Sequence, residues 1–78
     1  MIEIYGAAWC GYCNKAKQLC ESLDVKFTYY DVDKDDNKAK LFARMETPPQ
    51  TIPQIFVDGE HLEGGFTGLQ QHLEEKAA

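Results

Sequence analysis

Changes in the spacing of apolar residues divide the chain into predicted elements. Ile2 and Ile4 lie on the same side of residues 1–5, which predicts a first strand that Gly6 ends. Apolar residues then recur at helical spacing, which predicts a helix near residues 11–23. The inward stripe of this helix is expected to comprise Cys13, Ala16, Cys20 and Leu23, with Leu19 beside it.

A second strand and a second helix are predicted in the middle of the chain. Val25, Phe27 and Tyr29 alternate with the other residues of the segment 25–30, as side chains on the two faces of a half-buried strand do. Residues 33–36 are mostly acidic, and acids interact favourably with the start of a helix. Pro48 and Pro49 are expected to end this helix. Its apolar stripe is expected to comprise Ala39, Phe42 and Met45, with Leu41 alongside.

The last part of the chain predicts a hairpin followed by a helix. An Asp-Gly pair at 58–59 separates residues 54–57 from residues 60–62, which is a signal for a two-residue hairpin turn. Thr67, with Gln70 three residues later, forms a capping-box pattern that is expected to open the last helix. The inward residues of this helix are expected to be Leu69 and Leu73.

The predicted order is β-α-β-α-β-β-α, which places the chain in the α/β class. A helix joins the first two strands, so they are expected to be parallel with a right-handed crossover. The last two strands are expected to be antiparallel. A mixed four-stranded sheet with helices on both faces is the simplest arrangement of these elements.

The length and the net charge of the chain restrict the classes of function and partner that it can have. A chain of 78 residues, 44% of them hydrophobic, predicts one small domain over residues 1–78, with any site at its rim because no large cofactor cavity fits inside. The net charge of −5 argues against nucleic-acid partners and anionic membranes. The pattern of a signal peptide or a membrane span is not seen, so we expect a soluble, monomeric, cytoplasmic protein.

The chemistry centres on Cys10 and Cys13, which lie where the first strand meets the first helix. Unpaired backbone N–H groups and the positive end of the helix dipole favour a thiolate there. Cysteines of Cys-X-X-Cys motifs have pKa values of about 3.5 to 7.5, against about 8.5 for an unperturbed thiol. We therefore expect Cys10 to attack a disulfide and Cys13 to resolve the mixed disulfide. Lys15 and Lys17, with no acid over residues 7–20, suggest either a positive surface for an anionic partner or ordinary solvated side chains.

A zinc site and an inactive binding module are the two other interpretations of these cysteines. A zinc site would need further ligands, and only Cys20, His61 and His72 are available, none of them as a second pair. Cys20 is expected in the core, while both histidines are expected in structural or surface positions. A binding module with inactive cysteines is the non-enzymatic alternative, and the intact Cys10–Cys13 pair argues against it.

Together these motifs resemble those of the glutaredoxin family. Cys-Gly-Tyr-Cys at a helix start, Thr-Ile-Pro-Gln-Ile-Phe at residues 51–56, the Asp-Gly hairpin and the Gly-Gly pair at 64–65 come in the family's order. The short chain and the Gly-Gly-Phe segment are similar to small bacteriophage members. The resemblance implies a thioredoxin fold with strand order 2-1-3-4, a cis peptide bond before Pro53, and glutathione as reductant and co-substrate, with no tightly bound cofactor. It implies glutathionylated proteins, or a disulfide enzyme such as ribonucleotide reductase, as partners.

The resemblance also assigns roles to individual residues. It makes Cys10 the nucleophile and Cys13 the resolving thiol. Glutathione would contact Tyr12 at the rim of the site, the backbone of Ile52, and backbone N–H groups that hold the γ-glutamyl carboxylate, as helix N-termini hold carboxylates. The residues expected to bind glutathione are Tyr12, Thr51, Ile52, Pro53, Gly65, Phe66 and Thr67.

Three positions depart from the family pattern. Gly11 stands where proline is frequent, Ala7 where many members carry lysine, and Thr67 where an acid is common. The last two remove a cation and an acid, which should weaken the grip on the two charged ends of glutathione, and Lys15, Lys40 and Arg44 are the candidates to compensate. Members without that proline sometimes hold a [2Fe–2S] cluster between two protomers, so Cys10 as a cluster ligand is an alternative.

A thioredoxin-like reductant is a further alternative, because Ala-Trp-Cys-Gly at residues 8–11 is similar to the approach to a thioredoxin active site. Thioredoxin reductase would then serve the protein in place of glutathione. Tyr12 argues against this alternative, since a thioredoxin has proline before its second cysteine.

Overall fold

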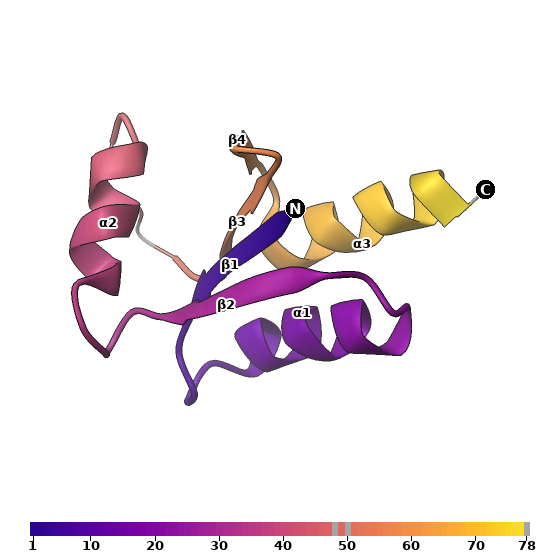
Figure 1. The fold of residues 1–78 in the computed structure, drawn as a ribbon, viewed down its shortest axis with the longest axis horizontal. Coiled ribbons are helices and arrows are strands. Elements are labelled where there is room, and N and C mark those ends of the chain that lie inside the picture. Colours follow the sequence, from indigo (N-terminus) through magenta and orange to yellow (C-terminus); the bar gives the residue numbers. More distant parts are fainter. Residues whose placement is uncertain (48, 50, 78) are drawn as a thin grey trace.

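The computed structural model describes residues 1–47, 49 and 51–77. Among them, no helix is both long and apolar enough to cross a membrane. The elements follow the predicted order and are shown in Figure 1. They are β1 (Ile2–Gly6), α1 (Gly11–Ser22), β2 (Phe27–Asp31), α2 (Asn37–Arg44), β3 (Gln54–Val57), β4 (Glu60–Leu62) and α3 (Gly65–Ala77).

The strands form one mixed sheet in the order β2-β1-β3-β4. β1 pairs with β2 in parallel and with β3 in antiparallel, and β3 pairs with β4 in antiparallel. Ile4 is the residue of β1 that lies opposite both Tyr29 of β2 and Ile55 of β3. This confirms the predicted mixed sheet, the parallel first pair and the strand order that the family resemblance implies.

Two apolar clusters hold the helices to opposite faces of the sheet. On one face, side chains of β1 and β3 pack against α1 and α3, with Ile4, Ala16 and Leu69 fully buried among them. On the other face, Tyr5 and Phe56 pack against Leu41 of α2. Figure 1 accordingly shows α2 set apart from α1 and α3. The predicted helices on both faces are confirmed.

Small differences from prediction occur at element ends. Gly6 is expected from the sequence to break the strand, but it belongs to β1 as its last residue and is paired with Asp31 of β2. β2 begins at Phe27 rather than at residue 25. Leu23, expected in the inward stripe of α1, is the C-cap of the helix and is 48% exposed, because the helix ends before it.

The predicted apolar stripe of α2 is only partly correct, since Leu41 and Met45 pack against the second cluster as predicted but the other two residues do not. Leu41 is buried, whereas Ala39 and Phe42 are exposed. The helix is turned so that Leu41 and Arg44, one turn apart, face the sheet, where Arg44 donates two hydrogen bonds to the Glu3 carboxylate at 3.0 and 3.1 Å. The helix also ends at Arg44, well before Pro49, so the prolines do not end it. Pro48 lies outside the described residues.

The capping box predicted at Thr67 is also wrong, because α3 begins two residues earlier, at Gly65. The Gly68 N–H donates to the Gly64 carbonyl at 3.1 Å, which closes the first turn of the helix before Thr67 could cap it. Gly64 has φ +94° and Gly65 has φ +55°, values that favour glycine. The glycine pair therefore turns the chain directly from β4 into the helix. Leu69 and Leu73 are buried as predicted.

Candidate active site

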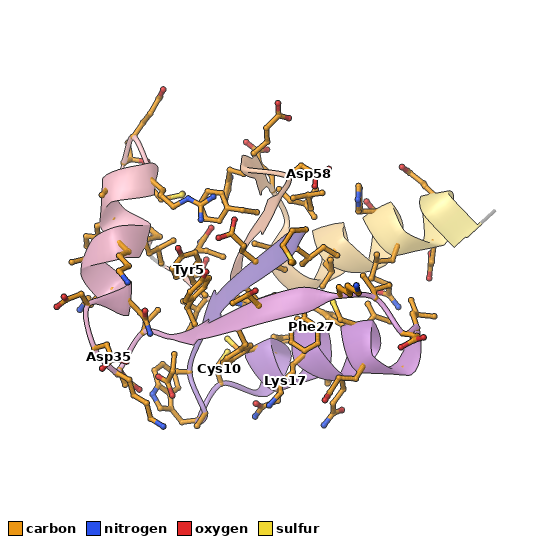
Figure 2. The ribbon with its side chains drawn as sticks, in the orientation of Figure 1. Tyr5, Cys10, Lys17, Phe27, Asp35 and Asp58 are labelled. Carbon is orange, nitrogen blue, oxygen red and sulfur yellow. The ribbon has the colours of Figure 1, made fainter. Side chains whose placement is uncertain are left out.

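Cys10 is the N-cap residue of α1 and has extended backbone angles. Its N–H donates to the Ala7 carbonyl at 3.1 Å, and its carbonyl accepts from the Asn14 N–H at 3.1 Å. The Cys13 N–H donates to the Cys10 sulfur at 3.2 Å. This donor and the positive end of the helix dipole both interact favourably with negative charge on that sulfur. Figure 2 shows Cys10 at this end of α1, between the loop after β1 and the helix.

Cys13 lies one turn further along α1 and has no exposed surface. Burial is the main reason that the pKa of the Cys13 thiol is raised, from 9.0 to about 12, and the contact with Cys10 raises it further. The backbone of Ala7 and the Tyr29 hydroxyl act in the opposite direction, because hydrogen bonds from them to the thiolate favour the charged form. Both Cys10 and Cys13 are free thiols, and only Cys10 is partly exposed. The two sulfurs therefore occupy different environments although they are close together.

The segment before β3 forms a second wall beside Cys10. The Cys10 thiol donates to the Ile52 carbonyl, with sulfur and oxygen 3.7 Å apart. The peptide bond between Ile52 and Pro53 is cis, as the family resemblance implies. Pro53 is buried and Thr51 is exposed, so the segment runs from the core to the surface past the sulfur of Cys10.

Exposed aromatic side chains precede and follow Cys10 closely in the chain. Tyr12 is 60% exposed, and its ring centroid lies 6.1 Å from that of Phe66 at the start of α3. The ammonium group of Lys15 lies 5.0 Å from the centroid of the Tyr12 ring. Trp9 is 74% exposed, and its indole N–H donates to an Asp33 carboxylate oxygen at 2.7 Å. Such partly exposed rings provide apolar contact area for a molecule that reaches Cys10.

The first turn of α3 contributes the last part of the site. Gly65 packs against Pro53, since a Cβ at Gly65 would lie 3.5 Å from the Pro53 carbonyl oxygen. Phe66 is half-buried and faces Tyr12, whereas Thr67 is exposed in the first turn of the helix. Backbone N–H groups in the first turn of a helix have no acceptor within the helix.

A hollow of about 280 Å³ begins beside Trp9 and Ile52, and we call it the Trp9 hollow. It extends from the active-site segments to the surface of α2. Its lining residues are Trp9, Val32, Asp33, Lys38, Leu41, Phe42, Pro49, Thr51 and Ile52. A larger hollow, of about 520 Å³, is lined by Met1, Leu23 and Val57 among others and by no cysteine, so it lies away from the reactive groups.

The remaining candidates of the sequence analysis lie elsewhere. Cys20 is buried in the core as predicted. His61, on the edge strand β4, lies within hydrogen-bonding distance of the Gln54 side chain, at 2.7 Å, and His72 is partly buried on α3. Within the described ranges, no three His, Cys, Asp or Glu side chains are grouped as metal ligands.

Comparison with known proteins identifies the family. A family model described as Glutaredoxin matches residues 2–62. The chain belongs to the glutaredoxin family. Glutaredoxin 1 of Escherichia coli K12 is 36% identical over 78 residues, which cover 92% of this chain and 91% of that protein. Membership of this family, together with the Cys-X-X-Cys pair, identifies a thiol–disulfide oxidoreductase.

Solved glutaredoxin structures share the thioredoxin fold of this chain. Reduced Escherichia coli glutaredoxin matches with a TM-score of 0.78 and 34% identity, covering 97% of this chain and 95% of that one. A buckwheat glutaredoxin–glutathione complex matches with a TM-score of 0.74 and 25% identity, covering 96% of this chain and 70% of that one.

Two contacts of the site were not predicted from the sequence. The hydrogen bond between Trp9 and Asp33 joins the residue before Cys10 to the loop after β2, and no local pattern signals it. The sequence pattern assigns Tyr29 only to a strand, although its hydroxyl lies beside the sulfur of Cys13. The alternation in residues 25–30 places Tyr29 on the same side as Val25 and Phe27, which is the side that α1 covers. That alternation is the signal that could have revealed the contact.

Proposed function

We propose that this glutaredoxin reduces protein disulfides and glutathione mixed disulfides with glutathione as the electron donor. In this proposal Cys10 is the nucleophile and Cys13 the resolving thiol. The observation that carries the proposal is the asymmetry of the pair, in which a partly exposed sulfur at a helix N-terminus lies over a fully buried one. An outside disulfide can reach Cys10, and Cys13 can reach only Cys10.

The surroundings of Cys10 support a glutathione site. The Ile52 backbone next to the Cys10 sulfur suits pairing with the cysteinyl unit of the tripeptide. The backbone N–H groups of Gly65, Phe66 and Thr67, in the first turn of α3, suit its γ-glutamyl carboxylate. Tyr12 completes the rim. The buckwheat relative that binds glutathione has the same fold, which adds support.

The opposite end of glutathione carries a glycyl carboxylate, and Lys38 is the best-placed cation for it. Lys38 lines the Trp9 hollow together with Thr51 and Ile52. Arg44 is engaged elsewhere, since it is paired with Glu3 and its guanidinium lies 3.8 Å from the centroid of the Phe56 ring. A lysine at position 7 would have no open space, because Ala7 is fully buried.

The partners in this proposal are glutathionylated proteins or a disulfide enzyme such as ribonucleotide reductase, in the cytoplasm. A reduced glutathione pool is available in that compartment to return the protein to the dithiol form. The bacterial glutaredoxin relatives are compatible with this assignment.

Replacing each cysteine in turn tests the proposed roles. Cys10→Ser should abolish disulfide reduction with glutathione, glutathione reductase and NADPH, because the attacking sulfur is gone. Cys13→Ser should abolish reduction of protein disulfides but retain part of the activity on glutathione mixed disulfides, since that reaction needs only the first thiol. Cys20→Ala is the matched control and should stay active, because Cys20 lies in the core away from the site.

The electron donor is tested by exchanging the recycling enzyme. Wild-type protein should turn over with glutathione and glutathione reductase and not with thioredoxin reductase alone. Turnover with thioredoxin reductase only would refute glutathione dependence. Unchanged activity of Cys10→Ser would refute the proposed nucleophile.

A further inference from the structure

Tyr29 of β2 lies directly beneath the two cysteines. Its hydroxyl donates to the Ala7 carbonyl at 3.4 Å, which is long for an O–H···O bond. Gly6 shows how closely the groups converge, because a Cβ there would lie 2.6 Å from the Tyr29 oxygen and 2.8 Å from the Cys13 sulfur. The hydroxyl and the sulfur therefore both lie against the same side of Gly6 in β1.

The Tyr29 hydroxyl remains a hydrogen-bond donor under ordinary conditions. Burial is the main reason that the pKa of Tyr29 is raised, from 10.0 to about 12, and the neighbouring Cys13 raises it further. Lys17 lies over the outer face of the ring, with its ammonium group 5.6 Å from the ring centroid. The phenol thus keeps its proton while Cys13 changes between thiol, thiolate and disulfide.

We propose that Tyr29 assists thiol–disulfide exchange by turning its hydroxyl from the Ala7 carbonyl to the Cys13 sulfur when negative charge develops there. This inference rests on the proposed roles of Cys10 and Cys13. The long bond to Ala7 is weak and is lost at little cost, whereas a hydrogen bond to an anionic sulfur in a buried site is stronger. Among the described side chains, only those of Tyr29 and Cys10 are placed to hydrogen-bond with the buried sulfur.

The step that Tyr29 assists is the closure of the Cys10–Cys13 disulfide. The Cys13 thiol releases its proton, and its sulfur attacks the Cys10 sulfur of the mixed disulfide. The bond between Cys10 and the substrate sulfur breaks, and the departing substrate thiolate takes up a proton. Cys13 is oxidised and the substrate sulfur is reduced, so no further oxidant or reductant is needed. Tyr29 donates a hydrogen bond throughout and keeps its own proton.

Removing the Tyr29 hydroxyl changes the rate of disulfide closure in two opposing ways. Losing the donor raises the pKa of Cys13, and each unit lowers the thiolate fraction tenfold. The more basic thiolate is roughly threefold more nucleophilic, because nucleophilicity rises with a Brønsted slope of about 0.4–0.5. Disulfide closure should therefore slow by roughly three- to tenfold when the hydroxyl is removed.

Tyr29→Phe tests the inference, since it keeps the ring and removes the hydroxyl. Reduced protein is mixed with oxidised glutathione, and closure is followed by the fluorescence of Trp9, the single tryptophan of the chain. The first-order closure phase should slow by roughly three- to tenfold. Tyr30→Phe is the matched control, because Tyr30 follows Tyr29 on the same strand but belongs to the opposite face, where its hydroxyl meets Glu3. Closure in Tyr30→Phe should match that of wild type.

A second comparison separates a direct effect on Cys13 from a structural one. In a Cys13→Ser background, Tyr29→Phe should leave the turnover of glutathione mixed disulfides unchanged, because Cys13 is no longer there to be assisted. An equal loss in that background, or an unchanged closure rate in Tyr29→Phe, would overturn the inference. Reaction of Cys10→Ser with oxidised glutathione at the wild-type rate would instead refute the proposed function.

A further variant covers the case in which Tyr29→Phe does not fold. Incorporating 3-fluorotyrosine at position 29 nearly preserves the shape and makes the hydroxyl a stronger donor. Closure should then be faster than in wild type. Unchanged or slower closure in a folded fluorotyrosine protein would count against the inference.

Discussion

At the residue scale, the chemistry depends on how differently two nearby cysteines are placed. Cys10 precedes the first turn of α1 and is partly exposed, whereas Cys13 points into the molecule and is fully buried. The sequence predicts the first property, because Cys10 falls where a strand meets a helix. The high pKa of Cys13 could not be predicted, since it depends on packing against β1 and β2.

Lys38→Gln is expected to weaken binding of glutathione-containing substrates. The substitution removes the cation of the Trp9 hollow but keeps a polar side chain of similar length. Because an exposed ion pair contributes about 0.2–1 kcal/mol, KM for a glutathione mixed disulfide should rise by up to about fivefold, with kcat little changed. Steady-state kinetics with a glutathionylated peptide measures both constants.

Lys40→Gln is the matched control for this prediction. Lys40 belongs to the same helix but does not line the Trp9 hollow, so KM should stay at the wild-type value. Equal increases in KM for the two variants would show that α2 acts only through its overall charge. A KM unchanged in Lys38→Gln would remove Lys38 from the glutathione site.

At the element scale, local patterns predict most elements but not the orientation of every helix. α1 has three buried residues in its stripe, and its inward face was predicted correctly except at Leu23. α2 has only eight residues and one buried side chain. The pairing of Arg44 with Glu3, distant in sequence, helps to decide which side of this helix faces the sheet. Similarly, α3 starts at Gly65 because of the backbone angles of the glycine pair, which outweigh the capping pattern at Thr67.

Gly11→Pro is expected to stabilise the protein through the first turn of α1. Gly11 is the first helical residue, where proline is favoured and no N–H is needed for the helix. Cys10 before it has φ −92° and ψ 114°, which a following proline accepts, and nothing lies within 4 Å of a Cβ at Gly11. The unfolded chain loses conformational freedom, so the free energy of unfolding should rise by about 0.5–1 kcal/mol. Thermal unfolding of the reduced protein measures the change.

Gly59→Pro is the matched control for this prediction, because the same substitution is expected to destabilise the protein there. A Cβ at Gly59 also meets nothing within 4 Å, but its φ of +87° cannot be adopted by proline. This variant should unfold at a lower temperature than wild type. A loss of stability in Gly11→Pro similar to that in Gly59→Pro would contradict the account of the first turn of α1.

At the scale of the whole molecule, the site forms where distant segments meet. Residues 9–13, Tyr29 and residues 51–53 come together with the start of α3. The parallel register that sets Gly6 opposite Asp31 and Ile4 opposite Tyr29 brings the tyrosine under α1. The alternation in residues 25–30 places Tyr29 on the face that α1 covers, but local sequence patterns carry no information on the register that sets it beside the cysteines. The cysteines and the proline segment could therefore be predicted from motifs, while the floor of the site required the structure.

The redox state of the molecule should determine how its stability responds to alkaline pH. In the folded reduced protein, burial raises the pKa of Cys13 from 9.0 to about 12, so the unfolded chain loses this proton first. Between these values the native state binds more protons than the unfolded state, and stability falls as pH rises, by up to about 1.4 kcal/mol per pH unit. The oxidised protein has no thiol at Cys13 and lacks this loss.

Urea unfolding of the reduced and oxidised forms from pH 7 to pH 11 tests this expectation. The two curves of stability against pH should diverge above about pH 9, with the reduced form falling more steeply. Cys20, whose pKa is also raised by burial, ionises in both forms and does not contribute to the difference. The pKa of Tyr29 is raised mainly by burial and partly by Cys13, so the part that depends on Cys13 adds to the difference in the same direction. Cys13→Ser removes the buried thiol and should follow the shallower slope of the oxidised protein. If reduced Cys13→Ser lost stability as steeply as reduced wild type, the alkaline loss would come from groups other than the buried Cys13 thiol.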